Sequence, residues 1–569
     1  MKKIFLLLLF LPQIIFAQTF PSPHFPQNVF RNPLDIPMLL AGGYGEIRPG
    51  HFHEGLDLKT EGRIGLPVHA AAAGYISRIS ISNTGFGHVV YVTHPDGFTT
   101  VYGHLNRFNP ALENYVKQQQ YAKESWAVDL KFPPGMFPVK QGQLIAYSGA
   151  TGSVAGPHVH FEIRNTLSEH PLNGLLFGLN IKDNIPPTVY RMALYNMDRS
   201  IYEQNPDVYG LQKESGIYAP SKKLILFNGD KIGFGVQALD HMNNTSGTFG
   251  IYEEILYVDG KPQIGFRLNN IGYEETRYVD AHTDYKTFKE TGRHFELLFS
   301  LPGNKLPIYY NFGGNGTLDI SDGKAHTIKI IVRDADGNTS TVQFEVQKNP
   351  TFKGLEKMNY ANTMYVSSRN IFENNHVQFY LEPGTLYDSI CFHYQQVSTD
   401  KPGFHSGIFQ LGNSDIPMYH SFNLNLKPQK TIPESLHNKV VIVRRDSRGS
   451  GEDVRAAKWD RGWLVARFNN FGNFSIQTDT IPPVITPLNI HDNVDLSKAA
   501  DIRFRIGDNK SGVASYRGEL DGKWLLFGQK RNVIYYTFDE HCPPGEHTLK
   551  LTVTDAVSNQ SVRIYHFKR

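Results

Sequence analysis

The chain has 569 residues, of which 40% are hydrophobic, 12% aromatic and 20% charged. This length exceeds one ordinary domain and suggests three or four, and the composition excludes an intrinsically disordered chain. The formal net charge is +3, and removal of Lys2 and Lys3 lowers it by two, to +1. So small a charge argues against nucleic acid as a partner, because it supplies no long-range attraction to phosphates. Abundant Tyr and Phe, punctuated by Gly and Pro, predict an all-β chain of many short strands.

The first 17 residues have the layout of a secretory signal peptide, with two lysines, an apolar stretch and then the small residue Ala17. A retained membrane anchor is the alternative, but Pro12 and Gln13 interrupt a stretch that is already short for spanning a bilayer. No later segment is apolar for long enough to cross a membrane. We therefore expect cleavage after Ala17, no transmembrane segment in the mature chain, and export to the periplasm, the cell envelope or the extracellular space.

Two short segments, residues 183–187 and 479–483, share the pattern D-x-I-P-P, and an apolar, β-branched run follows each of them. Consecutive prolines cannot join a sheet interior or a helix, so both segments are expected to be domain joints. The predicted division is a signal peptide (1–17), an N-terminal segment (18–36), and four domains (37–182, 183–347, 348–479 and 480–569).

The ends of two of these domains repeat. Residues 324–346 resemble residues 546–567: both alternate apolar and polar side chains, turn at an Asp and an Asn four residues apart, and resume a strand. This pattern is typical of antiparallel sandwich strands and resembles bacterial immunoglobulin-like modules. We predict immunoglobulin-like β-sandwiches at 183–347 and 480–569, and a further β-rich domain of unassigned type at 348–479. The turn residues Asp334 and Asp555 are most simply Asx-turn formers, because the sequence shows no acidic cluster around them that would bind calcium.

Cys391 and Cys542 are the only cysteines. They fall in different predicted domains, so we expect two buried thiols. A disulfide bridge stays open as the alternative in an oxidising compartment.

Residues 41–175 hold the side chains that point to chemistry. HFHEGLDLKT places His53 and Asp57 four positions apart, TVYGHL places His104 further on, and GPHVHFEIR places His158 and His160. Two imidazoles and one carboxylate form a three-ligand set that leaves one position of a catalytic zinc ion open for water. Water bound to zinc loses its proton near neutral pH, and further histidines can transfer protons or stabilise an oxyanion.

The run PHVHFEI alternates and is predicted to form a strand, on which His158 and His160 point to the same face. One imidazole can then bind metal while the other acts on substrate. Glu162 shares this face, and we expect it to orient a ligand. Tyr102, in TVYGHL, is a second candidate for orienting a ligand or contacting substrate.

The ordered series of motifs resembles the lysostaphin/LytM-type family of zinc metalloendopeptidases that hydrolyse peptidoglycan. The resemblance covers residues 41–175 through HEGLD, GLPV, AAAAG, GFG, VVYVTHPDG, TVYGHL, KQGQLIAYSGATG and GPHVHFEIR. Carried over by position, it implies zinc ligands at His53, Asp57 and His160 and catalytic histidines at His104 and His158. It also implies one Zn²⁺ per peptidase domain and a duplicated-hybrid-motif fold, an antiparallel β-sheet groove along which a peptide substrate lies.

The chain departs from the family pattern in a long insert between His104 and Lys140. We expect this insert to form a wall or a lid of the groove. His88 and His69 replace residue types common in the family, but neither position belongs to the implied metal set.

The leading hypothesis is therefore an exported zinc endopeptidase that cuts peptide cross-links of peptidoglycan. The alternatives are a catalytically inert relative that activates other cell-wall hydrolases and a wall-binding scaffold. Peptidoglycan peptides are the expected partner. The β modules are expected to position the peptidase, through other envelope proteins or on the wall itself.

Overall fold

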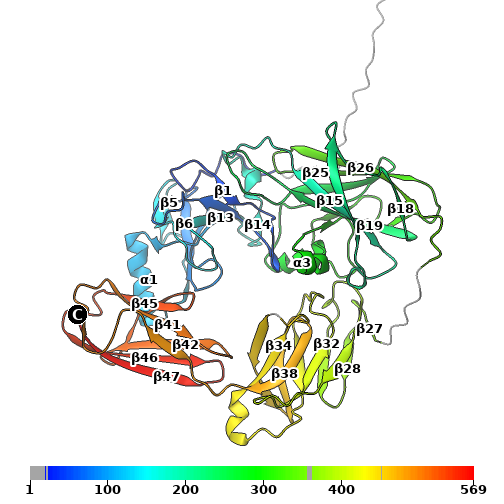
Figure 1. Ribbon diagram of the computed structural model, residues 1–569. Coiled ribbons are helices and arrows are strands. Elements are labelled where there is room, and N and C mark those ends of the chain that lie inside the picture. The colour runs from blue at the N-terminus through cyan, green and yellow to red at the C-terminus, as the bar shows by residue number, and fades with distance from the viewer. Residues whose placement is uncertain (1–19, 21–23, 355–361, 450) are drawn as a thin grey trace, which may run out of the picture.

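The computed structural model describes residue 20 and residues 24–354, 362–449 and 451–569, so the predicted signal peptide lies outside the described residues. The predicted all-β class is confirmed (Figure 1). Within the described residues the α-helices are α1 (Pro110–Ala122), α2 (Val279–His282) and α3 (Tyr285–Thr291). We refer to residues 37–182, 183–347, 348–479 and 480–569 as regions one to four; their limits stay a prediction.

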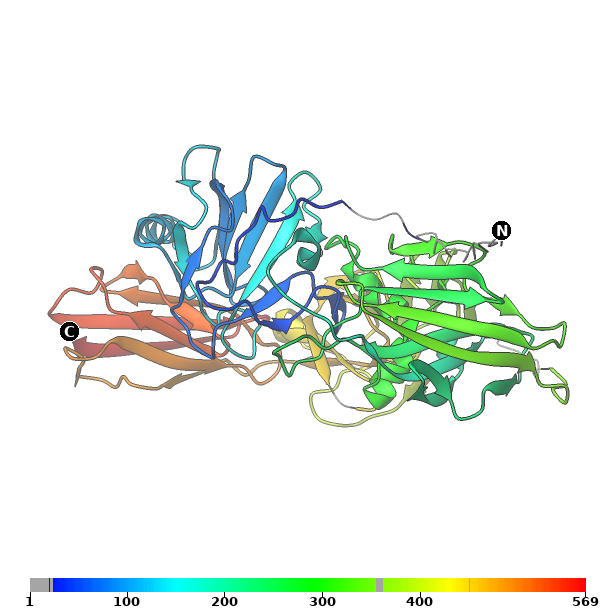
Figure 2. The same cartoon turned by 90° about the horizontal axis from the view of Figure 1, so that it is seen from above.

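Region one is built on a large antiparallel sheet, drawn in blue to cyan in Figures 1 and 2. Its main path runs through seven strands, in the order β1 (Leu40–Gly42), β4 (Leu56–Lys59), β13 (His158–Asn165), β8 (Phe98–Gly103), β7 (His88–Thr93), β6 (Gly74–Ile81) and β10 (Val128–Lys131). A three-stranded sheet of β5 (Pro67–His69), β12 (Leu144–Tyr147) and β9 (Arg107–Phe108) accompanies it.

Strand β13 lies inside the large sheet, with β4 on one side and β8 on the other. His160 lies opposite Asp57 of β4 on one side and opposite Gly103 of β8 on the other. The alternation of HVHFEIRN sends Val159, Phe161 and Ile163 into the apolar core, where all three are fully buried. The histidines and Glu162 therefore share the opposite face, as the period of two requires.

The other regions are sheets as well. The principal strands of region two are β15 (Thr188–Asn196), β16 (Asp207–Glu214), β17 (Ile217–Pro220), β19 (Lys231–Leu239), β20 (Glu253–Val258), β21 (Lys261–Arg267), β25 (His326–Arg333) and β26 (Thr339–Lys348). Region three has two five-stranded sheets, β28 (Asn370–Glu373), β29 (Val377–Leu381), β33 (Phe422–Leu426), β37 (Trp463–Phe468) and β36 (Lys458–Asp460), and β31 (Tyr394–Val397), β32 (Ile408–Leu411), β38 (Gly472–Thr478), β34 (Val440–Arg445) and β35 (Glu452–Ala456). Region four has a sheet of β39 (Val484–Pro487), β41 (Asp501–Gly507), β45 (Val533–Thr537) and β44 (Gly528–Lys530), and a sheet of β40 (Val494–Asp495), β47 (Gln560–Lys568), β46 (Glu546–Asp555), β42 (Val513–Leu520) and β43 (Lys523–Leu525).

The sequence repeat corresponds to two matching hairpins, β25–β26 in region two and β46–β47 in region four. In each turn the Asp side chain accepts a hydrogen bond from the backbone N–H of the Asn four residues later, at 2.9 Å from Asn338 and 2.7 Å from Asn559. Asp555 also accepts from the Val557 N–H at 3.0 Å, which is the bond of an Asx turn, so this turn is confirmed for Asp555 and stays a prediction for Asp334. The immunoglobulin-like type of these two regions stays a prediction.

The four regions contact one another in a closed circuit, which is visible as a ring of ribbons in Figure 1. Region two meets region three where the Tyr387 hydroxyl donates to the Arg277 carbonyl at 2.7 Å. Region three meets region four where the Lys439 ammonium donates to the Val557 carbonyl at 2.9 Å. The chain thus returns to its own first region instead of extending away from it.

The insert of region one closes this circuit. Asn109 caps α1 by accepting from the Leu112 N–H, and Pro110 starts the helix with the φ angle that a first turn needs. The outer face of α1 packs on region four, where Tyr121 stacks on His541 at a ring-centroid distance of 3.6 Å and Lys117 pairs with Glu540 at 2.9 Å. The helix α1 is thus a docking element for region four, and the expected wall or lid of the groove stays a prediction.

Regions one to three share one apolar core, whereas region four has a core of its own. Between regions one and two, the Thr276 hydroxyl accepts from the Phe52 N–H at 2.9 Å, and the Asn173 side chain donates to the Leu268 carbonyl at 3.1 Å. Cys391 and Cys542 are buried in regions three and four, as expected of two thiols. No helix among the described residues is long and apolar enough to span a bilayer.

The shared core predicts how truncations behave. A chain ending at residue 182 is expected to lose cooperative unfolding, because it exposes apolar side chains that regions two and three cover. A chain lacking only residues 480–569 is the matched control and is expected to keep a cooperative transition, because region four contributes a separate core. Circular dichroism during heating measures both, and a piece 1–182 that unfolds as cooperatively as the full chain would contradict the shared core.

Candidate metal centre

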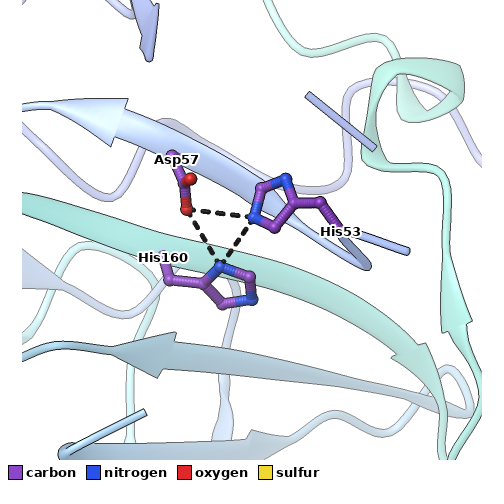
Figure 3. A group of neighbouring side chains, drawn as sticks. All are labelled: His53, Asp57 and His160. Atoms are coloured by element: carbon purple, nitrogen blue, oxygen red, sulfur yellow. Dashed lines mark hydrogen bonds and ion pairs between the residues drawn. The ribbon is translucent and has the colours of Figure 1, made fainter. Parts of the chain in front are cut away.

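Three side chains from separate segments of region one converge on a single point (Figure 3). His53 Nε2 lies 3.1 Å from Asp57 Oδ1 and 3.1 Å from His160 Nδ1, and the latter lies 3.0 Å from Asp57 Oδ1. All three residues are buried, with 3–5% of their surface exposed. The structure thus brings together the three residues that the sequence predicts as metal ligands.

The local backbone explains why they meet. His53 lies in the turn between β3 (His51–Phe52) and β4, while Asp57 and His160 lie opposite each other on β4 and β13. Gly55 stands between the first two ligands, and a Cβ atom there would come within 2.6 Å of the His160 ring. The glycine of HEGLD is therefore needed for His160 to approach the other two side chains.

The outer nitrogen of each ligand imidazole faces an acceptor. His53 Nδ1 lies 2.7 Å from the Gly43 carbonyl, and His160 Nε2 lies 2.8 Å from Glu162 Oε1. A carbonyl and a carboxylate only accept, so both outer nitrogens carry the hydrogen. In the neutral rings the inner nitrogens are then lone pairs, and they face each other and a carboxylate oxygen. Three acceptors at 3 Å repel unless a cation, either a proton or a metal ion, lies among them.

The ionisation of these groups reflects the same crowding. Burial raises the pKa of Asp57, but the neighbouring imidazoles of His158, His160 and His53 outweigh it and hold that pKa well below its usual range. Burial lowers the pKa of His160, but its hydrogen bonds to Asp57 and Glu162 raise it to about 9, so at neutral pH a proton on His160 is the cation that a metal ion would replace. Burial lowers the pKa of His53. The carboxylate is therefore charged, and the cluster attracts positive charge.

The second pair of predicted histidines lies beside this cluster. His104 follows β8 directly, and its imidazole lies 4.7 Å from that of His158 between ring centroids. The Nδ1 of His104 bonds the Thr151 carbonyl at 3.0 Å, and the Nδ1 of His158 bonds the Gly156 carbonyl at 3.0 Å. Each ring therefore presents Nε2 as a lone pair, and His158 Nε2 lies 3.4 Å from Asp57 Oδ1.

Two further features hold His104 in this state. Its φ of 60° places it in the left-handed region, which a non-glycine residue adopts only when the surroundings impose it. Burial, with the nearby His160 and His158, lowers the pKa of His104 to about 3, so its imidazole is neutral at physiological pH.

Glu162 lies behind the metal ligand and belongs to a buried network. Its Oε1 accepts from His160 Nε2 and, at 2.6 Å, from the hydroxyl of Tyr273, while its Oε2 accepts from Arg164 Nε at 2.6 Å. Burial opposes ionisation, but Arg164 and His160 lower the pKa of Glu162 to about 2, so the carboxylate stays charged. A charged acceptor fixes the tautomer and orientation of His160.

Tyr102, the other candidate for this role, is corrected by the structure. It pairs with Phe161 on β13 and points to the core face, opposite to His160. Its hydroxyl accepts from the Ala71 N–H at 2.7 Å and bonds Thr100 at 2.9 Å, and the residue is fully buried. The period of two in β8 excludes Tyr102 from the metal face.

Several residues of this centre were not identified in the sequence. Arg48 donates to Asp57 Oδ2 at 2.8 Å, which leaves Oδ1 for the cluster. Glu54 is buried beside Thr276, and burial raises its pKa to about 8. Arg164 continues the alternation of His158, His160 and Glu162 along β13, so its place on the same face could have been predicted from the strand pattern. For Tyr273, which arrives from region two, the sequence offered no indication.

Region four lies close to the loop that precedes His158. A cavity of about 650 Å³ is lined by residues of loop 150–155 on one side and by residues of β41, β44, β45 and the turn between the last two on the other, among them the basic side chains Arg503, Lys530 and Arg531. The surroundings of the centre therefore include a second sheet far along the chain.

Comparisons with known proteins cover the same segment. Residues 51–123 match Peptidase family M23, and residues 361–479 match a Zu5-like domain. The chain is 31% identical over 125 residues to cell division protein DipM of Caulobacter vibrioides, which is 22% of this chain and 16% of that protein. It is 30% identical over 127 residues to DD-carboxypeptidase/endopeptidase Mpg of Neisseria meningitidis, which is 22% of this chain and 23% of that protein.

Two more proteins complete these comparisons. Peptidoglycan DD-endopeptidase ShyC of Vibrio cholerae is 30% identical over 150 residues, which is 25% of this chain and 28% of that protein. The solved catalytic domain of lysostaphin from Staphylococcus simulans is 29% identical, covering 23% of this chain and 84% of that one, with a TM-score of 0.18. The chain thus spans less than a third of the length of these curated relatives. Its first region contains a domain of peptidase family M23, of the LytM and lysostaphin type.

Proposed function

We propose that this chain is an exported zinc metalloendopeptidase that hydrolyses peptide cross-links of bacterial peptidoglycan. The observation that carries the proposal is the convergence of His53 Nε2, Asp57 Oδ1 and His160 Nδ1 within 3.0–3.1 Å of one another. Both outer nitrogens of these imidazoles already donate to acceptors, so the inner lone pairs are available to a cation.

The donor set fits Zn²⁺. Two imidazole nitrogens and one carboxylate oxygen are ligands that zinc accepts, and three protein ligands leave a fourth position for water or substrate. Arg48 occupies the second oxygen of Asp57, so the carboxylate offers a single oxygen. When bound, zinc supplies a Lewis acid that polarises a carbonyl and lowers the pKa of a coordinated water molecule.

The remaining work falls to His104 and His158. With Nδ1 of each ring engaged by a backbone carbonyl, Nε2 is the atom that takes or gives a proton. Protonated at Nε2, either imidazole donates a hydrogen bond to the oxygen that becomes negative as the peptide bond is attacked. The adjacency of their rings allows one histidine to hold the proton while the other stabilises the oxyanion.

Peptidoglycan as substrate is supported by the relatives, two of which are named as a DD-carboxypeptidase/endopeptidase and a peptidoglycan DD-endopeptidase. The predicted signal peptide supports export to the periplasm or cell envelope, where such peptides occur. Retention of all three proposed ligands and both histidines favours catalysis over an inert activator. The cavity between loop 150–155 and region four supports a part for that region in holding substrate or an envelope partner.

The direct test is product analysis on purified peptidoglycan. The full chain without residues 1–17 is expected to release shorter cross-linked fragments or monomeric muropeptides, detected by liquid chromatography and mass spectrometry. A zinc chelator should abolish the release and added Zn²⁺ should restore it. Release that continues in chelator, or none with zinc bound in stoichiometric amount, would overturn the proposal.

Variants separate metal binding from proton transfer. His160→Ala is expected to lose stoichiometric zinc, because it removes a ligand atom and leaves Glu162 without its imidazole partner. His158→Ala is expected to keep zinc and to lower turnover by about 10²–10⁴-fold, the usual contribution of a proton-transferring group. Metal content by elemental analysis and initial rates on the same substrate measure both effects, and equal zinc and equal activity in the two variants would refute the roles.

The network behind His160 has its own test. Glu162→Gln is expected to weaken zinc binding by about 10–100-fold, since it removes the charge that orients and polarises His160. Tyr273→Phe, which removes one hydroxyl in region two, is expected to weaken zinc binding in the same direction by less. Tyr365→Phe at an exposed position is the control. Competition with a chromogenic chelator measures the zinc affinities. If Glu162→Gln lowers the melting temperature of the metal-free protein but leaves the zinc affinity unchanged, Glu162 stabilises the fold and does not support metal binding.

A further inference from the structure

Three aspartates that are far apart in the sequence meet at the joint between regions one and two. Asp183 lies in the D-x-I-P-P segment, Asp240 directly follows β19, and Asp334 directly follows β25. One carboxylate oxygen of each lies within 4.8 Å of the others. The expectation that Asp334 stands without an acidic cluster is therefore wrong, because the partners come from other strands and not from its own turn.

Two of these carboxylates have a buried oxygen without a hydrogen-bond partner among the described residues. Asp240 is 1% exposed, and its Oδ1 has neither solvent contact nor a hydrogen-bond partner among the residues that the structure describes. The same holds for Oδ2 of Asp183, whose Oδ1 accepts from the Ile185 N–H at 3.1 Å. A buried carboxylate oxygen without a partner is costly, so each of these atoms needs a hydrogen-bond donor or a cation.

The charged groups that act most strongly on Asp240 are negative as well. Burial, followed by the nearby carboxylates of Asp334, Asp183 and Asp336, raises the pKa of Asp240 to about 8. Like charges brought together away from water repel, and a bound cation removes both the repulsion and the unmet acceptor at once.

Region four carries the equivalent cluster and provides an internal comparison. Asp479, Asp508 and Asp555 occupy the same motif positions and again gather within 4.8 Å. There, both oxygens of Asp479 accept backbone N–H groups, from Ile481 and Ser511.

Two ammonium groups donate to backbone carbonyls in the segments that carry this second cluster. The Lys510 ammonium donates to the carbonyl of Thr478, the residue before Asp479, and the Lys439 ammonium donates to the carbonyl of Val557, two residues after Asp555. Of the three carboxylates, only the Oδ1 of Asp508 lacks a partner among the described residues. The same frame therefore leaves one buried carboxylate oxygen without a partner in region four and two in region two.

We propose that Asp183, Asp240 and Asp334 bind one Ca²⁺ ion that fastens the joint between regions one and two. The donors are all carboxylate oxygens, with no imidazole or thiolate, which favours a hard cation over zinc. Calcium accepts irregular sets of carboxylates completed by water, whereas magnesium demands near-octahedral geometry.

An ion at this position would connect segments of region two that contact region one. The loop after Asp240 reaches region one, where the Thr245 hydroxyl accepts from the Lys59 ammonium at 2.8 Å and donates to the Leu40 carbonyl at 3.3 Å. Lys59 and Leu40 belong to β4 and β1, the edge of the sheet that carries Asp57. One cation thus ties the connecting segment and two loops of region two together, beside the edge of the peptidase sheet.

The experiment is calcium titration of the zinc-loaded full chain, without residues 1–17, in calcium-free buffer. Isothermal titration with CaCl₂ is expected to show one ion per chain, with a Kd of about 10⁻³ M or tighter, the range of extracellular calcium modules. Calcium is also expected to raise the melting temperature. Asp240→Asn is expected to abolish both effects, and Asp508→Asn, the matched change in region four, is expected to leave both intact.

The loss of calcium binding in Asp240→Asn can be distinguished from a failure of this variant to fold. Asn has the shape of Asp and removes one of the clustered charges, so Asp240→Asn without calcium is expected to melt at or above the temperature of the calcium-free parent. If Asp240→Asn fails to fold, Asp183→Asn in the connecting segment replaces it, with the same expected loss of calcium binding. The proposal is overturned if the parent binds no calcium at millimolar concentration, or if the folded region-two variant binds it as the parent does. It is equally overturned if Asp508→Asn alone loses the ion.

Discussion

The convergence of buried hydrogen-bond acceptors is the constraint on which the first region depends. His53, Asp57 and His160 face one another with lone pairs because the Gly43 carbonyl and Glu162 take the hydrogens of the two imidazoles. These three acceptors repel one another unless a proton or a metal ion lies among them, so the cluster requires a cation. The fully buried core behind β13, the glycine at position 55 and the charge on Glu162 all serve that one requirement.

Much of this centre was predictable because its geometry is local. A strand places residues i and i+2 on one face whatever its neighbours are, so His158, His160 and Glu162 were expected together from HVHFEI alone. Applied to TVYGHL, the same rule places Tyr102 and Gly103 on different faces of β8. Gly103 pairs with His160 across the sheet and shares its face, so Tyr102 belongs to the other face. The prediction for Tyr102 was wrong because it did not take into account that side chains alternate between the two faces of a strand.

What the sequence did not contain is the long-range pairing of the chain. Tyr273 contacts Glu162 across 111 positions, and α1 docks on region four across more than 400, as the Lys117–Glu540 pair shows. Periodicity and turn residues specify which segments are strands and where they turn, but they carry no information about which sheet meets which. The all-β class was therefore accessible, whereas the closed circuit of regions and the shared core of the first three were not.

The two aspartate clusters extend the same electrostatic argument beyond the peptidase. Regions two and four use one frame, a D-x-I-P-P segment and a hairpin turn closed by Asn, to bring three carboxylates together. In region four both oxygens of Asp479 accept backbone N–H groups and one carboxylate oxygen of the cluster lacks a partner, whereas in region two such a partner is missing for two oxygens, at the joint with the peptidase. Because the two regions share the same arrangement of aspartates, the different number of oxygens without a partner is due to the residues around each cluster. The cluster with more such oxygens is the one at the joint with region one, beside the strands of the metal centre.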